Sequence, residues 1–497
     1  MTTPTLSQPT TDNRRHAQRR RWLLVALAVV GVVASGLVYD RLFRERAAPY
    51  FESDAEHFLY GSIGAESIDS VPYWIWLVLP RVFPDLLPGA GGYSSLGLVS
   101  EGAHELPVGL SMVTIGYPRV AINCAFCHTG SVRSRPDEPP RIVAGAPAHQ
   151  TSAQAYTRFL TAAAADPRFN AGTILGEIAR NYRLSFVDRL LYRFVVIPGT
   201  RQRLLRLRNE TAWTSRHPDW GAGRADILNP IKFRRLGRPV DATIGTADMM
   251  PLWSTASRAH GLFWDGSTSS LRDAVVTSAL GSGASRPWLD RDVARWDESG
   301  NERSSLRRIH DYMMALKPPP YPFPLDAPLA SAGEAVYKAE CAECHAHAGT
   351  GGGDVASVSS VGTDDNRRTV WTADATTAYD TFSGGRAWQS PTVAVRDGYL
   401  AVPLDGLWLR APYLHNGSVP SLTDLLNAPQ SRPSRFWRGY DVYDAAKVGF
   451  VSDGAEAQRL GTVYDTTQPG NANTGHSYGT DLPAESKRAL LEYLKTL

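Results

Sequence analysis

A strong excess of charge of either sign is missing from this sequence. Its 52 Lys and Arg residues nearly balance 49 Asp and Glu residues, which leaves a formal charge of +3. Nucleic-acid-binding proteins usually carry a pronounced basic surface, so we expect no nucleic-acid partner. Hydrophobic residues make up 43% and charged residues 20% of the chain, which excludes a disordered or fibrous protein. With 497 residues, the chain has room for two or three domains.

Long apolar runs are also missing, with one exception near the N-terminus. Residues Trp22 to Tyr39 are uncharged and apolar, and as a helix they would span about 27 Å, close to the thickness of a bilayer core. Arginines precede this run at positions 14, 15, 19, 20 and 21, and the positive-inside rule keeps them in the cytoplasm. We therefore predict a basic cytoplasmic tail over 1–21 and an inner-membrane anchor over 22–39, with the bulk of the chain in the periplasm. The alternative is a signal peptide cleaved near Ala34, which would leave a soluble periplasmic or secreted protein.

Cysteine is scarce, and its placement is informative. All four cysteines fall in two copies of one pattern, Cys124-Ala-Phe-Cys127-His128 and Cys341-Ala-Glu-Cys344-His345. Two thiols three positions apart can form thioethers to the vinyl groups of one haem, and the adjoining histidine then ligates the iron. A disulfide framework rarely uses every cysteine in such pairs, and a zinc site needs neither the histidines nor so wide a separation. We predict two covalently bound haem c groups, held by Cys124, Cys127, Cys341 and Cys344, with His128 and His345 as proximal iron ligands.

The two haem motifs belong to two related halves. Trp264-Asp-Gly-Ser-Thr-Ser-Ser-Leu-Arg-Asp273 aligns without a gap on His415-Asn-Gly-Ser-Val-Pro-Ser-Leu-Thr-Asp424. An Arg-Ala pair stands upstream of each segment, at 258–259 and at 410–411. Each half then closes on a similar helical pattern, Asp311-Tyr312-x-x-x-Leu316 and Glu492-Tyr493-x-x-x-Leu497. This order indicates a duplicated cytochrome unit.

The predicted fold is mainly α, with two related cytochrome c-type haem domains, long ordered loops and one N-terminal transmembrane helix. The proline-rich stretch over 318–324 interrupts regular structure, so we divide the chain into a first haem domain with an extended wrap, a linker and a second haem domain, over 40–317, 318–330 and 331–497. We expect helices near 151–165, 186–197, 303–316 and 331–340. Val71 to Leu87 is apolar but broken by Pro80 and Pro84, which predicts a buried or interfacial segment.

Methionine is absent after residue 315, so the second domain cannot supply a methionine as the sixth iron ligand. Its other histidines are His347, His415 and His476. His347 is too close to the proximal ligand to reach the opposite face of the haem. His476 lies in a Gly/Asn-rich loop that can fold over a haem, so we predict it as the distal ligand, and a solvated loop histidine is the alternative. Tyr413 and His415 are weaker distal candidates.

The first haem has no obvious sixth ligand. His149 is the nearest candidate along the chain, followed by Met249, Met250 and His260. We therefore expect a five-coordinate or weakly capped iron, which makes this haem the reactive one. Phe263 and Trp264 are then candidate pocket or inter-haem residues, and an ordinary aromatic core is the alternative.

At Leu262-Phe-Trp-Asp-Gly266 and Arg410-Ala-Pro-Tyr-Leu-His-Asn-Gly417 the chain resembles the bacterial dihaem cytochrome c peroxidase superfamily, which includes the methylamine-utilisation dihaem enzyme and the rubber oxygenase. The resemblance covers roughly 115–497. It implies that Trp264 bridges the two haems, and that a calcium ion could lie between the domains. Classical members follow the first turn with a Glu-Gln pair, where this chain has Asp273-Ala274. That departure, together with Trp408 and the late His476, is more similar to the rubber oxygenase branch, in which the first haem binds dioxygen and the second is bis-histidine.

The sequence is compatible with three functional hypotheses. The leading one is a periplasm-facing, membrane-anchored dihaem oxidoreductase that activates dioxygen or peroxide at the first haem and relays electrons through the second. Its partners would be a small oxidant or organic substrate and an electron-donating or electron-accepting redox protein. The second is a non-catalytic electron carrier with both haems six-coordinate. A haem-bearing sensor module is the third, and the sequence has no adjoining signalling domain to favour it.

Overall fold

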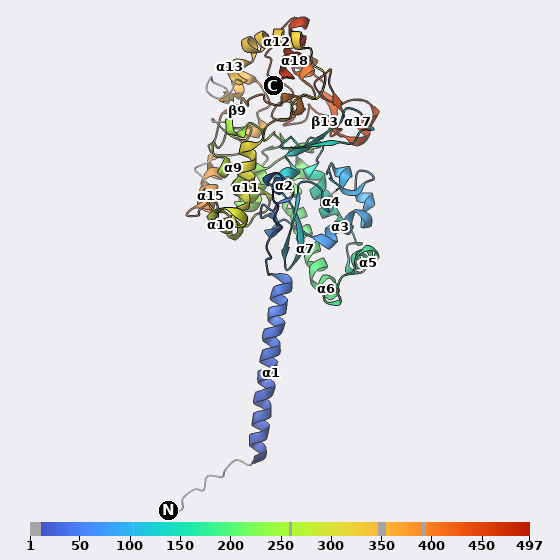
Figure 1. Cartoon of the computed structure of the whole chain (residues 1–497), viewed down its shortest axis with the longest axis vertical. Helices are drawn as coiled ribbons and strands as arrows, with labels where there is room; N and C mark the ends of the chain where they lie inside the picture. The colour runs from blue at the N-terminus through green and yellow to red at the C-terminus, as the bar shows by residue number, and fades with distance from the viewer. Residues whose placement is uncertain (1–10, 103, 258–260, 346–353, 390–393) are drawn as a thin grey trace, which may run out of the picture.

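The computed structural model describes residues 11–102, 104–257, 261–345, 354–389 and 394–497. A long helix, α1 (Thr11–Leu42), projects from one end of a helical body (Figure 1). Its segment Gln18–Leu42 is long and apolar enough to cross a membrane, and its most apolar part is wholly exposed. Length and composition therefore agree with the predicted anchor, although a cleaved signal sequence has the same two properties.

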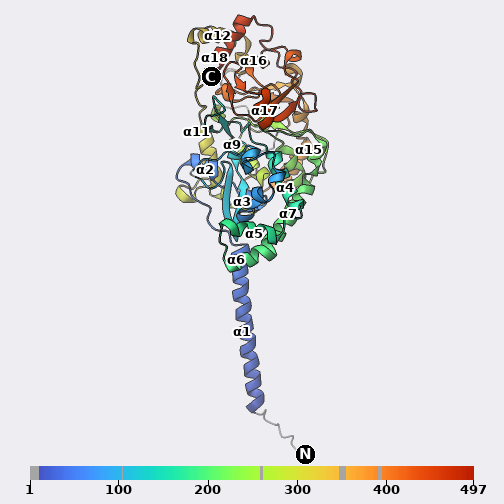
Figure 2. The ribbon, with the colours of Figure 1, turned by 90° about the vertical axis from the view of Figure 1, so that its right-hand side faces the viewer.

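The first half of the body contains most of the helices. They are α2 (Asp54–Tyr60), α3 (Tyr73–Val82), α4 (Ala153–Ala165), α5 (Ala171–Asn181), α6 (Phe186–Leu191), α7 (Ile197–Glu210), α8 (Leu228–Pro230), α9 (Leu271–Ser282), α10 (Arg286–Ala294) and α11 (Ser305–Ala315). The second half has α12 (Ala327–Glu340), α13 (Ala342–His345), α14 (Val358–Val361), α15 (Ala373–Ser383), α16 (Leu422–Leu425), α17 (Gly454–Leu460) and α18 (Ala484–Leu494). Figure 2 shows α5 and α6 at the end of the body from which α1 emerges.

The described strands are short and pair antiparallel. The largest sheet has the order β1-β3-β2 (Val71–Pro72, Tyr117–Ile122, Leu110–Ile115). The other sheets are two-stranded: β4 (Thr129–Val132) with β5 (Arg141–Ala144), β6 (Arg224–Ala225) with β7 (Ala247–Asp248), β8 (Val355–Ser357) with β9 (Gly398–Leu400), β10 (Arg435–Arg438) with β13 (Thr462–Asp465), and β11 (Tyr443–Asp444) with β12 (Gly449–Phe450).

Several helix boundaries differ from the sequence prediction. Helix α12 begins at Ala327, four residues earlier than predicted, because Asp326 caps its N-terminus and Pro328 is tolerated in the first turn. The segment 186–197 is interrupted by a π-turn over Tyr192–Val196 before α7 begins. Pro80 lies inside the buried helix α3 rather than ending it, since tertiary packing outweighs the lost backbone hydrogen bond.

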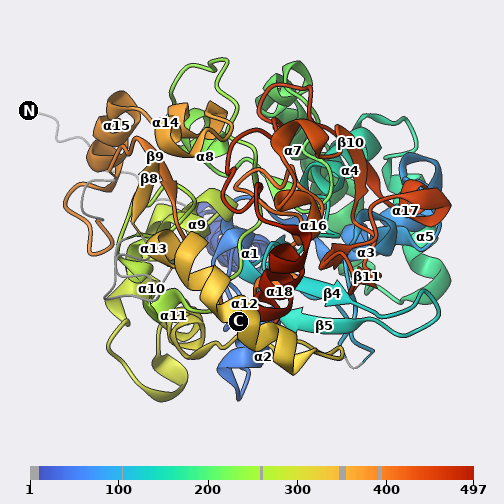
Figure 3. The same cartoon turned by 90° about the horizontal axis from the view of Figure 1, so that it is seen from above.

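Helices α12 and α18 cross at the end of the body opposite α1 (Figure 3). Gly333 permits a very close approach: a Cβ atom there would lie 1.9 Å from the carbonyl oxygen of Ala489. Beside the crossing, the rings of Tyr337 and Tyr493 pack with centroids 5.1 Å apart. In the first half the corresponding contact joins α2 to α11, where Phe58 packs on Tyr312 at 4.9 Å. Each half is thus closed by its last helix packing on an earlier one.

Two of the hydrophobic cores contain residues from both sides of the predicted linker at 318–330. Trp371, Tyr379 and Trp388, from the second half, pack into the core around α9 and α11. Trp253 and strands β4 and β5, from the first half, pack with Trp408 in the core of the second. Composition along the chain predicts the linker but does not show which segments pack across it. The domain limits remain a prediction from the order of the chain.

Candidate functional site

Both Cys-x-x-Cys-His motifs fold into the same tight turn. The backbone N–H of His128 donates to the carbonyl of Cys124 at 3.1 Å, and that of His345 donates to Cys341 at 3.0 Å. The first turn follows β3, where the side chain of Asn123 accepts from Ala125 N–H and donates to two carbonyls of the α2 region. The second turn follows α12 directly. This geometry puts both thiols and the histidine of each motif in one turn.

The two histidines are oriented by equivalent hydrogen bonds. His128 Nδ1 lies 2.8 Å from the carbonyl oxygen of Met250, and His345 Nδ1 lies 2.9 Å from that of Val402. A carbonyl oxygen can only accept, so Nδ1 carries the proton and Nε2 keeps its lone pair. A second-sphere bond of this kind is typical of metal-ligating histidine. Burial lowers the pKa of His345, which favours the neutral form that binds a metal.

A large cavity faces the first motif. It has a volume of about 390 Å³ and a mainly apolar wall, and it is lined by Cys124, Cys127 and His128 together with residues of α4, α9 and η7 (Ile231–Arg235). This size and lining are typical of a cofactor or ligand pocket. Burial raises the pKa of the Cys124 and Cys127 thiols to about 12, and neither forms a disulfide. The pair therefore consists of protonated thiols at the wall of an apolar chamber.

Four unsatisfied donors on the wall of this cavity support the fit to haem. They are Gln154 Nε2, Trp213 Nε1, Trp220 Nε1 and Arg367 Nε, all buried without a hydrogen-bond partner. Buried donors without partners are rare in folded proteins and call for an acceptor. The propionate groups of a haem are acceptors of the required kind. Apolar walls, paired thiols, an oriented imidazole and orphaned donors together fit a covalently attached haem.

In the second half, the loop that carries His476 folds over the second motif. The rings of His345 and His476 have centroids 6.2 Å apart. Two metal–imidazole bonds of about 2 Å each would place the ring centres roughly 6 Å apart, so the spacing accommodates one iron. His476 adopts a left-handed backbone (φ 45°), its N–H donates to Val361, and Arg432 donates to its carbonyl. Burial and then His345 lower the pKa of His476 to about 4.

The weaker distal candidates for the second haem have other partners. The hydroxyl of Tyr413 donates to backbone carbonyls, at 3.0 Å from Val448 and 3.3 Å from Leu407. The ring of His415 stacks on Tyr399 with centroids 3.7 Å apart. Neither residue is brought against His345 as His476 is. His347 lies outside the described residues.

For the first haem, the structure separates the sequence candidates. His149 stacks on Phe450 at 3.6 Å and is not part of the described cavity wall. The side chains of Met249 and Met250 do line the cavity, but the carbonyl of Met250 holds His128. His260 lies outside the described residues.

Phe263 and Trp264 both line the cavity. Trp264 packs against a cluster of Met250, Leu400 and Val402, which includes the two residues whose carbonyls accept from the proximal histidines. Its Nε1 donates to the carbonyl of Asp248 at 2.7 Å. Trp264 therefore belongs to the apolar cluster in which both of these supporting residues lie.

The turns that carry Trp264 and His415 repeat one another. Each has a residue in the left-handed region, Phe263 (φ 61°) and Leu414 (φ 69°). Each ends in a serine that caps the following helix, Ser270 on α9 and Ser421 on α16. The gap-free alignment found in the sequence is therefore matched by local backbone geometry.

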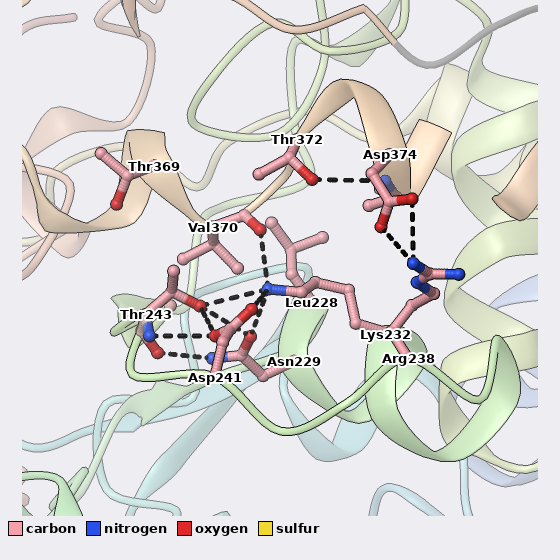
Figure 4. A network of polar contacts seen from close by, with 12 residues as sticks. Leu228, Asn229, Lys232, Arg238, Asp241, Thr243, Thr369, Val370, Thr372 and Asp374 are labelled. Atoms are coloured by element: carbon pink, nitrogen blue, oxygen red, sulfur yellow. Dashed lines mark hydrogen bonds and ion pairs between the residues drawn. The ribbon is translucent and has the colours of Figure 1, made fainter. Parts of the chain in front are cut away.

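A buried lysine ties the two halves together beside this site (Figure 4). The Lys232 ammonium donates to Asp241 at 2.6 Å, to Asn229 and Thr243 at 3.2 Å, and to the carbonyl of Val370 at 3.0 Å.

Within the described ranges no group of three or more His, Cys, Asp or Glu could hold a metal ion. Calcium therefore remains a prediction with no assigned ligands.

Sequence reasoning missed three features of the site. The orphaned donors could not be found, because isolated Trp, Gln and Arg residues carry no pattern. Helix α2, which Asn123 bonds, lies in a stretch without a motif. The carbonyl supports did have a signal, since Met250-Pro251-Leu252 and Val402-Pro403-Leu404 begin 14 residues before Trp264 and 13 residues before His415.

The two turns and the cavity beside the first have the features expected of sites for covalently bound haem c. Comparison with known proteins agrees at this level: residues 398–438 match the family model described as RoxA-like, cytochrome c-like. That match covers the Val402 support and the His415 turn. A cytochrome c-like segment implies covalently bound haem c, and it supports the resemblance to dihaem cytochromes and the rubber oxygenase at a coarse level.

Two proteins of Sinorhizobium fredii are similar to parts of the chain. The uncharacterized protein y4iM is 36% identical over 236 residues, which are 38% of this chain and 53% of that protein. The uncharacterized protein y4iJ is 43% identical over 108 residues, 20% of this chain and 18% of that protein. The chain thus spans about half the length of the first relative and less than a fifth of the second.

Proposed function

We propose that this chain is a membrane-anchored, periplasm-facing dihaem cytochrome that acts as an oxidoreductase, activating dioxygen or peroxide at the N-terminal haem and relaying electrons through the C-terminal haem. The observation that carries the proposal is an asymmetry between the two motifs. His345 faces a second imidazole, that of His476. His128 instead faces a cavity whose described lining contains no second histidine.

A haem iron with one open face supplies the capacity to activate dioxygen or peroxide. The side chains of this chain prepare the pocket for it. The bond from His128 Nδ1 to Met250 fixes the plane of the imidazole and raises its basicity. The apolar wall excludes water, which protects reactive species and strengthens electrostatic interactions. An apolar organic substrate suits such a chamber.

Electron relay between the halves is supported by Trp264. Its side chain packs against the apolar cluster that contains Met250 and Val402, and the carbonyl of each of these two residues is hydrogen-bonded to a proximal histidine. A path from His128 to His345 through this cluster would consist of these two hydrogen bonds and packed side chains. A periplasmic redox protein would deliver or remove electrons at the second half.

Two measurements test this proposal together: the number of haems per chain and the consumption of dioxygen or peroxide. We expect two haems per chain by pyridine haemochrome assay, one in Cys124→Ala/Cys127→Ala and one in Cys341→Ala/Cys344→Ala. Consumption of dioxygen or peroxide with an electron donor should be lost in the first double variant. A single haem in the wild-type chain, or equal consumption by the first double variant, would overturn the proposal.

The second candidate function is electron transfer without catalysis. Met249 favours it, because this residue lines the cavity and thioethers are common sixth ligands of haem c. If Met249 ligated the first iron, Met249→Leu would convert a ligand-inert haem into one that binds carbon monoxide. Under the oxidoreductase proposal, the wild-type first haem already binds carbon monoxide and Met249→Leu changes this little.

A further inference from the structure

An apolar surface lies on α6 and the turn that follows it. We call it the α6 face; its members are Phe186, Val187, Leu190, Phe194 and Val195, exposed by 76%, 55%, 41%, 68% and 46%. The opposite side of the same segment buries Tyr192, Val196 and Ile197 in the core. A helix that is apolar on both its buried and exposed sides is unusual on a water-facing surface and marks an interaction site.

The α6 face lies where the membrane helix enters the body. Figures 1 and 2 both place α6 beside the end of α1, and Arg41 of α1 forms an ion pair with Asp188 of α6 at 2.5 Å. If Trp22 to Tyr39 crosses the hydrocarbon core, Arg41 lies two residues beyond it, about 3 Å further along the helix. That depth is the boundary between lipid headgroups and acyl chains.

The residues that follow α1 are hydrogen-bonded to the body of the protein. Arg46 N–H donates to the carbonyl of Thr114 at 2.9 Å, and Gly116 N–H donates to that of Arg44 at 2.8 Å. Glu45 pairs with Ile115 in a β-bridge to the same hairpin, β2–β3. These contacts hold the α6 face at a defined distance from the membrane.

The charged residues around the α6 face are mainly arginines, which attract anionic phospholipid headgroups. Arg183, Arg189 and Arg193 are exposed on the same segment, and Asp188 is neutralised by Arg41. Exposed apolar side chains flanked by arginines are the composition of segments that lie in a membrane interface and attract anionic headgroups.

We propose that the α6 face inserts into the periplasmic leaflet of the bilayer that α1 crosses, as a second, interfacial contact with anionic phospholipid. The body then has a fixed orientation over the membrane. Even a chain cleaved near Ala34 would keep an affinity for the lipid surface, although one apolar contact alone gives reversible binding.

Photo-cross-linking of the full chain tests this contact. Benzoyl-phenylalanine replaces Phe194 in one variant, Leu460 in a second and Val33 in a third, each in haem-loaded protein in nanodiscs of phosphatidylcholine and phosphatidylglycerol. Leu460 is the matched control, because it is 51% exposed on α17, away from α1 in Figure 1. Val33 lies within α1 and reports that reconstitution succeeded.

Mass spectrometry then identifies the adducts. We expect phospholipid adducts at position 194 in at least tenfold higher yield than at position 460, and adducts at position 33. Equal yields at 194 and 460, with adducts at 33, would overturn the proposal. A protein–protein adduct at 194 in place of lipid would also overturn it and assign the α6 face to a second copy of the chain.

Discussion

The crossing of α12 and α18 gives a prediction whose size follows from the structure. A Gly→Ala change inside a helix normally stabilises it by about 1 kcal/mol. At Gly333 the new methyl group would lie 1.9 Å from the Ala489 oxygen and 2.9 Å from Tyr493 Cβ, so the helices must separate by more than an ångström. Overpacking costs about 1–3 kcal/mol, and a clash with backbone atoms at 1.9 Å puts this case at the upper end, about 3 kcal/mol. We expect Gly333→Ala to destabilise the α12–α18 pair by about 2 kcal/mol net.

Gly176 provides the matched control. It lies inside α5, and a Cβ atom there would meet nothing within 4 Å, so Gly176→Ala should stabilise its helix by about 0.5–1 kcal/mol. Native-state hydrogen exchange measures both effects locally, which avoids assuming two-state unfolding for a chain of several cores. A loss of about 2 kcal/mol corresponds to roughly thirtyfold faster exchange of α18 amides. Unchanged α18 protection in Gly333→Ala would refute the close crossing.

Other predictions concern buried charge. Burial, and then Arg308, lower the pKa of His57 to about 4. Because the unfolded histidine titrates near 6.5, the folded state loses about 3 kcal/mol as pH falls from 6.5 to 4; thermal unfolding of His57→Gln should show a shallower acid decline, and an identical decline would contradict this assignment. Lys232→Met removes the ammonium that donates to the Val370 carbonyl and takes one of two donors from the Asn229 oxygen, so it should cost about 2–4 kcal/mol. The exposed Lys338, paired with Glu334, is the control, and Lys338→Met should cost under about 1 kcal/mol; equal melting shifts would contradict the role of Lys232.

Local chemistry made parts of the site predictable from sequence. The Cys-x-x-Cys-His spacing fixes which atoms share one turn, and the repeated Gly-Ser turns share a backbone geometry that their residues dictate. His476 was a prediction from elimination and loop composition, and the structure places its ring beside that of His345. Whether it ligates iron remains a prediction.

Long-range packing was not predictable in the same way. Nothing local in Trp371 or Trp253 shows that each packs in the core of the other half. The π-turn after α6 and the early start of α12 reflect tertiary contacts and capping rather than apolar periodicity. The α6 face has an ordinary helical composition in the sequence. Only its position beside α1 in the structure indicates a contact with the membrane.

Carbon monoxide binding by the reduced, fully haem-loaded chain tests the central claim most directly. The proposed asymmetry predicts one carbon monoxide per chain for the wild type, because His476 caps the second haem while the first is open. His476→Ala should then bind two, with a new high-spin signal in the electron paramagnetic resonance spectrum of the oxidised protein. No binding by the wild type, or two molecules bound before any substitution, would contradict the account.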